Sequence, residues 1–120
     1  MFKVGDHIKV TKMAAVKDAE FPTPDPKDYT PGVINEGVSL PIEYEMEGVL
    51  SEEIETMQSL KMARSKRNGV QAVGFLITSP ITSVLHAEVY LQLTTLNSVY
   101  RVERIGDGVY VFDDDMRYDV

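Results

Sequence analysis

QSLKMARSKRNGVQAVGFLI, residues 58–77, has the pattern of a β-hairpin. The Asn68-Gly69 pair separates two arms that both contain apolar residues, and this dipeptide is typical of the type I′ turn, which needs positive φ at both central positions. On the first arm, Leu60 and Met62 are expected to face inward. The second arm, residues 70–77, is almost continuously apolar, which is the pattern of a central strand covered on both faces.

Segments on either side of this hairpin alternate between apolar and polar residues, the period of a half-buried strand. This alternation predicts strands at residues 2–10, 38–50, 87–94, 98–105 and 109–112. Residues 13–19 could form only a helical turn, and residues 51–57 either a helical turn or a wide loop. Pro80 cannot donate to a ladder, so the second hairpin arm is expected to end within TSPITS, residues 78–83.

The count of six to eight strands, with at most one or two helical turns, predicts a mainly β fold. We expect a small antiparallel β-barrel or a strongly bent sheet, because closure removes edges that a flat sheet leaves exposed. A two-sheet sandwich is the alternative. The chain has 120 residues, so we expect one β-rich domain over 1–120. Within it, the proline-rich segment 20–37 is interpreted as a surface loop that could carry a binding site, and 113–120 as an acidic tail.

Composition excludes several classes of protein. The chain has no cysteine, which rules out disulfides, thiolate metal sites and a cysteine nucleophile. It has no apolar run of the length of a signal peptide or a membrane span, so we expect a cytoplasmic protein with no membrane partner. The formal net charge of −7 argues against non-specific binding of nucleic acid, although a local basic patch could still bind it.

One local basic patch is predicted at the hairpin tip. β-ribbons can enter nucleic-acid grooves or follow single strands, so we expect its members to contact phosphates or an acidic protein. No aromatic residue is interleaved with these charges, which weakens any case for base stacking. The alternative is a solvated tip, or a tip paired with the glutamates of residues 43–47, at about 0.2–1 kcal/mol per cross-strand pair. The candidate binding residues are Lys61, Arg64, Lys66 and Arg67.

No catalytic or metal-binding pattern emerges. The carboxylates at residues 43–55 and 113–115 could bind a hard cation, but they lack the spacing of a calcium loop. His7 and His86 lie far apart and have no neighbours at ligand spacing. No serine lies in a Gly-x-Ser-x-Gly elbow. We therefore predict no catalytic residue, no metal and no cofactor, and the balance is against an enzyme.

Two stretches, RNGVQAVGFLITSPITSV (67–84) and TTLNSVYRVE (94–103), together resemble short uncharacterised bacterial proteins carried on phages, plasmids or integron cassettes. The resemblance implies a small, self-contained, β-rich accessory protein encoded on a mobile element. It implies no activity and transfers no catalytic residue.

The leading functional hypothesis is a non-enzymatic binding protein of unknown partner, which contacts a protein or nucleic acid through a charged β-face and could form a homodimer. A second hypothesis is an acidic inhibitor or adaptor that binds a basic protein, suggested by the net charge. A third is a small-ligand-binding or hydrolytic β-barrel with its site near the 20–37 loop.

Overall fold

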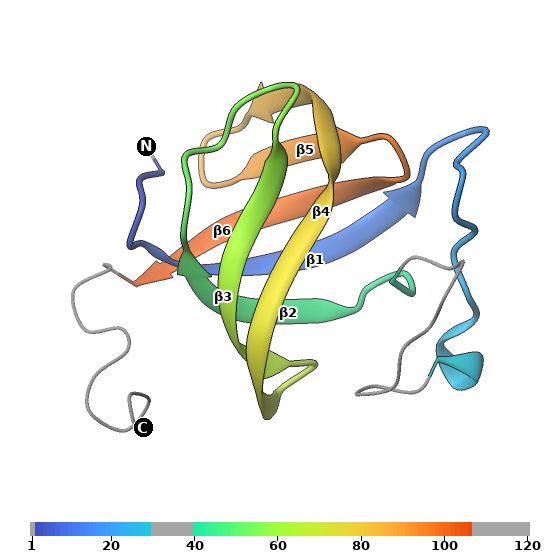
Figure 1. Cartoon of the computed structure of the whole chain (residues 1–120), viewed down its shortest axis with the longest axis horizontal. Coiled ribbons are helices and arrows are strands. Elements are labelled where there is room, and N and C mark those ends of the chain that lie inside the picture. The colour runs from blue at the N-terminus through green and yellow to red at the C-terminus, as the bar shows by residue number, and fades with distance from the viewer. Residues whose placement is uncertain (1, 30–39, 107–120) are drawn as a thin grey trace.

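The computed structural model describes residues 2–29 and 40–106. In this part of the chain six antiparallel strands follow one another around a closed barrel, and the first strand pairs with the last (Figure 1). The mainly β prediction is confirmed, with a barrel in place of a sandwich. The elements are β1 (His7–Ala15), a short 3₁₀ turn η1 (Pro26–Asp28), β2 (Glu45–Leu50), β3 (Ser59–Arg67), β4 (Val70–His86), β5 (Leu91–Thr95) and β6 (Ser98–Gly106).

The predicted hairpin is present and joins β3 to β4. Asn68 and Gly69 both have positive φ, 51° and 84°, as a type I′ turn requires. Leu60 and Met62 are buried in the core, as the alternation of the first arm predicted.

β4 does not end at Pro80, as the sequence suggested, but continues to His86. Its first half pairs with β3 as far as the Ser59–Pro80 pair, and its second half pairs with β5 from Ile81 onward. Pro80 therefore lies where β4 passes from one partner to the other. A residue without an N–H is tolerated at such an interruption of the ladder.

The first half of β4 is an edge. Among the described strands only β3 pairs with residues 70–79, and the lower part of β4 runs beside β3 and away from β5 (Figure 1). Val73, Phe75 and Ile77 on this segment are 66%, 73% and 63% exposed. The expectation of a central strand covered on both faces is therefore wrong.

Several predicted boundaries also shift. β1 begins and ends five residues later than the predicted 2–10 strand, because its ladder with β6 extends to the Ala15–Ser98 pair. The helical turn expected at 13–19 is therefore wrong for 13–15, and 16–19 form a turn closed by the N–H of Ala19 donating to the carbonyl of Val16. β2 begins at Glu45 because Glu43, with φ of 70°, breaks the extended chain before it. Residues 51–57 form a loop without a helical turn, and β5 begins only at Leu91. The predicted strand 109–112 and the tail 113–120 lie outside the described residues.

Buried apolar side chains from all six strands, and from the residue just before β2, fill the barrel. Because the interior is packed, sites for other molecules have to lie at the barrel ends or on its outer surface. The core consists of Ile8, Val10, Tyr44, Met46, Leu50, Leu60, Met62, Leu76, Ile81, Leu91, Leu93, Tyr100 and Val102.

Candidate functional site

Two members of the predicted basic patch lie on the outer face of β3. Lys61 forms an ion pair with Glu52, with 3.4 Å between Nζ and Oε2. Lys66 is exposed and stands opposite Glu47 in the register of β2 and β3. Lys66 is therefore opposite one of the glutamates of residues 43–47, as the alternative proposed, whereas Lys61 pairs with a glutamate outside that range.

The other two members lie on the inner face of the same strand. Arg64 stands opposite Gly48 and Arg67 opposite Met46, and both of these β2 residues are buried. The register of β2 and β3 shifts between these pairs, so Ser65 is an extra residue in the ladder. In a regular strand residues three apart point to opposite faces, but the irregularity at Ser65 turns both arginines inward. The four predicted residues therefore do not form one patch.

Arg64 is fixed in place by the neighbouring strand. Its Nε donates to the carbonyl oxygen of Ala72 at 2.7 Å, and its Nη2 donates to that of Val73 at 3.3 Å. The side chain passes over Gly74, where a Cβ would lie 2.5 Å from Nη2. Gly74 therefore leaves the space that the guanidinium occupies.

Two tyrosines lie close to these arginines. Tyr29 and Tyr44 meet edge to face, with ring centroids 5.2 Å apart and planes at 67°. Burial raises the pKa of Tyr44, while the charges of Arg67 and Arg64 lower it, which places both guanidinium groups within electrostatic range of the phenol. We call Arg64, Arg67, Tyr29 and Tyr44 the arginine–tyrosine cluster.

Two donors in this cluster are buried without a hydrogen-bond partner. They are Nε of Arg67 and Oη of Tyr44, whose residue is only 6% exposed. Burial lowers the pKa of Arg64, and the positive charge of Arg67 lowers it further. No described carboxylate contributes to the shift of the Arg64 pKa. The cluster therefore holds two positively charged side chains, and two of its donor atoms, Nε of Arg67 and Oη of Tyr44, have no acceptor.

Lys12 is a buried cation that the sequence analysis did not single out. Its Nζ donates to Thr23 Oγ1 at 3.0 Å and to the carbonyl oxygen of Leu40 at 2.9 Å, and burial lowers its pKa to about 8. Its backbone N–H bonds the carbonyl of Tyr44, so it lies beside the arginine–tyrosine cluster. Continuing the inward alternation of Ile8 and Val10 by two residues would have found it.

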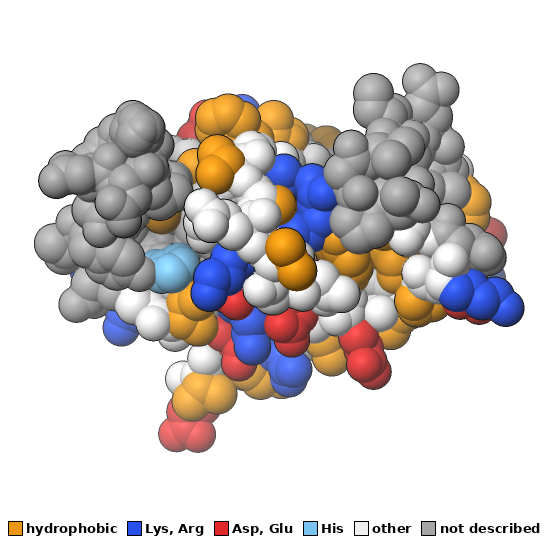
Figure 2. Space-filling view, turned by 90° about the horizontal axis from the view of Figure 1, so that it is seen from below, with side chains coloured by type: hydrophobic (Ala, Val, Ile, Leu, Met, Phe, Trp, Pro, Cys, Tyr) orange, Lys and Arg blue, Asp and Glu red, His pale blue; other side chains and the backbone are white. Residues whose placement is uncertain are grey.

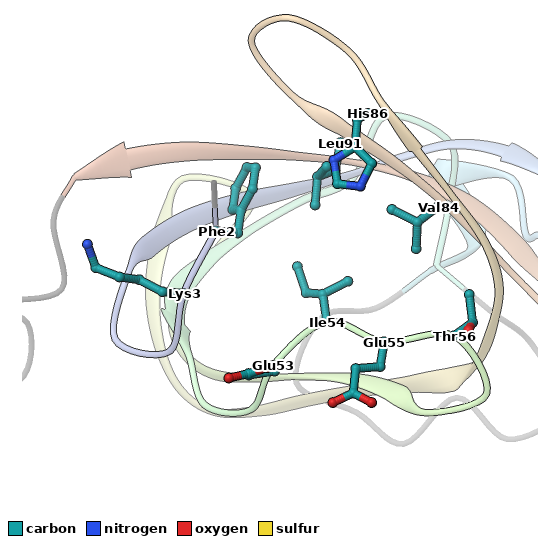
Figure 3. Close-up of a pocket in the computed structure, with 9 residues that line it drawn as sticks. All are labelled: Phe2, Lys3, Glu53, Ile54, Glu55, Thr56, Val84, His86 and Leu91. Carbon is teal, nitrogen blue, oxygen red and sulfur yellow. The ribbon is translucent and has the colours of Figure 1, made fainter.

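A hollow of about 390 Å³ lies between the start of the chain, the loop after β2, and strands β4 and β5 (Figure 3). Ile54 points into the hollow, where Phe2, Val84 and Leu91 complete an apolar lining. His86 lies on its rim, but the carboxylates of the two lining glutamates point away from the imidazole in Figure 3. The hollow therefore offers apolar contact and no acid–base pair.

The glutamates of β2 do not form a purely acidic surface. Lys9 lies 3.9 Å from Glu45 and 3.8 Å from Glu103, measured from Nζ to the carboxylate oxygens. On the face shown in Figure 2, basic and acidic side chains are intermixed. His7 is on β1 and His86 is at the end of β4, two strands that do not pair with each other. Burial lowers the pKa of His7 against an opposing contribution from Glu47.

Over residues 2–29 and 40–106, no three His, Cys, Asp or Glu side chains are placed to share a metal ion. In the same ranges no helix is long and apolar enough to cross a membrane. Comparison with protein-family models, curated proteins and solved structures gives no match to this chain.

Proposed function

We propose that this protein is a small, non-enzymatic binding protein that contacts a protein partner through β4. The observation that carries the proposal is the edge of β4 at residues 70–79, which pairs with no described strand other than β3 and presents Val73, Phe75 and Ile77 to solvent. An extended segment of a partner could add to this edge as a further strand. Main-chain hydrogen bonds would then supply affinity, and alternate side chains would supply specificity.

The sequence of this edge supports a binding role. Folded proteins usually protect sheet edges with lysine, proline or inward-pointing charge, because unpaired N–H and C=O groups recruit other chains. Residues 70–79 contain no charged residue and no proline. Contiguous exposed apolar side chains on a small protein commonly mark an interaction site.

The residues beside the edge define the kind of partner. On β3, Ala63 stands opposite Phe75 and Lys61 opposite Ile77, so the apolar stripe is bordered by a cation. A charge at the rim of an interface mainly affects association rate and salt dependence. Because Lys61 is already paired with Glu52, the surface suits an extended peptide with apolar residues at alternate positions and gives no preference for an acidic one.

The nucleic-acid version of the original hypothesis has less support. It needs four cations on one face, whereas Arg64 and Arg67 lie on the inner side of β3, leaving only Lys61 and Lys66 outside. The acidic-inhibitor version is likewise weakened by Lys9, which lies between Glu45 and Glu103.

The test is selection of short random peptides against the immobilised parent protein, followed by binding measurements on variants. Phe75→Lys should weaken the selected peptides by about tenfold or more, since it removes an apolar contact at the edge. Val89→Lys is the matched control, because Val89 is 76% exposed but lies outside residues 70–79. Amide exchange at residues 70–79 should slow when peptide is bound.

Failure to select any peptide, or equal loss of binding in both variants, would overturn the proposal. Self-association of the parent that protects residues 70–79 and disappears in Phe75→Lys would replace the peptide by a second copy of the chain. Binding of DNA or RNA that falls with salt and is lost in the Lys61, Arg64, Lys66 and Arg67→Glu quadruple variant would favour nucleic acid instead.

A further inference from the structure

We propose that the arginine–tyrosine cluster is a binding site for a phosphate group. The site adjoins residues 70–79 of β4, whose Ala72 and Val73 carbonyls hold Arg64, but it binds a different class of ligand and goes beyond the proposed contact with a protein partner. Arg67 is the last residue of β3, so the cluster lies at one end of the barrel, and its Tyr29 belongs to the proline-rich segment for which the sequence left open a small-ligand site.

The unpartnered donors are the first argument. Buried polar groups in proteins nearly always have a hydrogen-bond partner, so each exception needs an explanation. Here two exceptions, Nε of Arg67 and Oη of Tyr44, occur in one cluster. Both are donors, and a phosphate has several acceptor oxygens that could satisfy them together.

The charges are the second argument. The charge of Arg67 is close enough to lower the pKa of Arg64, and no described carboxylate contributes to the shift of Arg64. Two guanidinium groups held together match a phosphate monoester, which carries about −1.5 to −2 charges at pH 7, better than a singly charged carboxylate. Bonds between guanidinium and phosphate are charge-assisted and geometrically specific.

Preorganisation is the third argument. Arg64 is held by the carbonyls of Ala72 and Val73, so its orientation does not depend on a ligand. The extra residue Ser65, which turns Arg67 to the same face, is fixed by a hydrogen bond of 3.3 Å from its Oγ to the carbonyl of Glu47. The Tyr29–Tyr44 contact in turn orients the Tyr44 ring. A site whose donors are held in place loses less entropy when a ligand binds.

The experiment is a titration of the whole chain with inorganic phosphate and with phenyl phosphate, at constant ionic strength, followed by ¹H–¹⁵N spectra that include the arginine Nε–H signals. We expect a saturable shift of the Arg67 Nε–H signal. Thermal stability should also rise with ligand concentration, as expected for binding to the folded state alone. Tighter binding of phenyl phosphate would indicate an organic phosphate ester as the ligand, and equal binding would indicate free phosphate.

Three variants separate this site from general charge effects. Arg67→Gln should weaken phosphate binding by about tenfold or more, and Tyr44→Phe by a smaller factor, because it removes one donor and keeps the ring. Lys66→Gln removes the same charge from the outer face of the same strand and should leave affinity unchanged. Equal effects of Arg67→Gln and Lys66→Gln would overturn the proposal, as would the absence of saturable shifts in the parent. If Arg67→Gln fails to fold, the phosphate affinities of Tyr44→Phe and Lys66→Gln are compared instead. Equal affinities of these two variants would then overturn the proposal.

Discussion

Arg64 and Gly74 face each other across the β3–β4 ladder, and the arginine side chain fills the space that a Cβ on residue 74 would take. Such a Cβ would lie 2.5 Å from Nη2 and 3.2 Å from Cζ of Arg64. The glycine and the arginine therefore depend on each other, although the sequence separates them by the whole hairpin tip.

Gly74→Ala should lower the free energy of unfolding by about 1–3 kcal/mol, because it displaces the guanidinium from the carbonyls of Ala72 and Val73. The measurement is urea unfolding of a double-mutant cycle with Arg64→Ala. In the Arg64→Ala background, Gly74→Ala should be close to neutral. The same cost in both backgrounds would show that the two residues are not coupled.

Gly48→Ala should be more damaging. A Cβ at residue 48 would collide with the carbonyl oxygen of Ala63 and lie 2.8 Å from Cα of Arg64, and both contacts are with backbone that cannot rotate away. We expect a loss of about 3 kcal/mol or more, seen as a lower urea midpoint, since β2 and β3 must separate. A loss below about 1 kcal/mol would contradict the close approach of these strands.

Gly69→Ala tests backbone conformation without crowding. Nothing lies within 4 Å of a Cβ placed there, but φ is +84°, a region that L-residues with side chains rarely adopt. We expect a loss of about 1 kcal/mol in thermal or urea unfolding, from the strained turn alone. Replacement by D-alanine in a synthetic chain should restore stability, and a loss of equal size there would assign the effect to contacts.

Lys12 should make stability depend on pH. Burial lowers its pKa in the folded state to about 8 from 10.5, so between these values the unfolded chain holds the proton more tightly. Stability then rises with pH, by about 2 kcal/mol between pH 7 and 9.5 if Lys12 acts alone. Burial raises the pKa of Tyr44 and Tyr100 above 10, so their ionisation lies above this window.

The measurement is urea unfolding of the parent and of Lys12→Met at several values from pH 7 to 9.5. Methionine has a similar volume and no charge, so the variant should lack the rise that the parent shows. Parallel curves for the two proteins would show that Lys12 keeps an ordinary pKa.

The hairpin was predictable because its signals are local. Asn68-Gly69 determines the turn, and the alternation of Leu60 and Met62 determines which face of β3 is buried. The inward position of Arg67 was not predictable in the same way. It depends on the irregularity at Ser65, which belongs to the pairing of β3 with β2 and β4 and is not marked by any pattern within β3.

The exposed edge of β4 shows a different limit of sequence patterns. The apolar run Val73–Ile77 has the pattern of a strand that is covered on both faces. That pattern does not show whether another strand or loop is present to cover it. Whether such a run is covered depends on the next strand, and β5 spans only Leu91–Thr95, beside the second half of β4. Pro80, which suggested the end of the strand, lies instead where β4 stops pairing with β3 and begins to pair with β5.

The pairing of β1 with β6 has a consequence for how the molecule acquires its shape. During synthesis on the ribosome, β1 emerges first but obtains its second partner only after β6 has been made. Contacts between such distant parts of a chain slow folding, because a long loop must close before they form. Until β6 is made, the edge of β1 that pairs with β6 has no partner. A nascent chain that stalls before β6 should therefore be bound by chaperones and cut by proteases more readily than the complete chain.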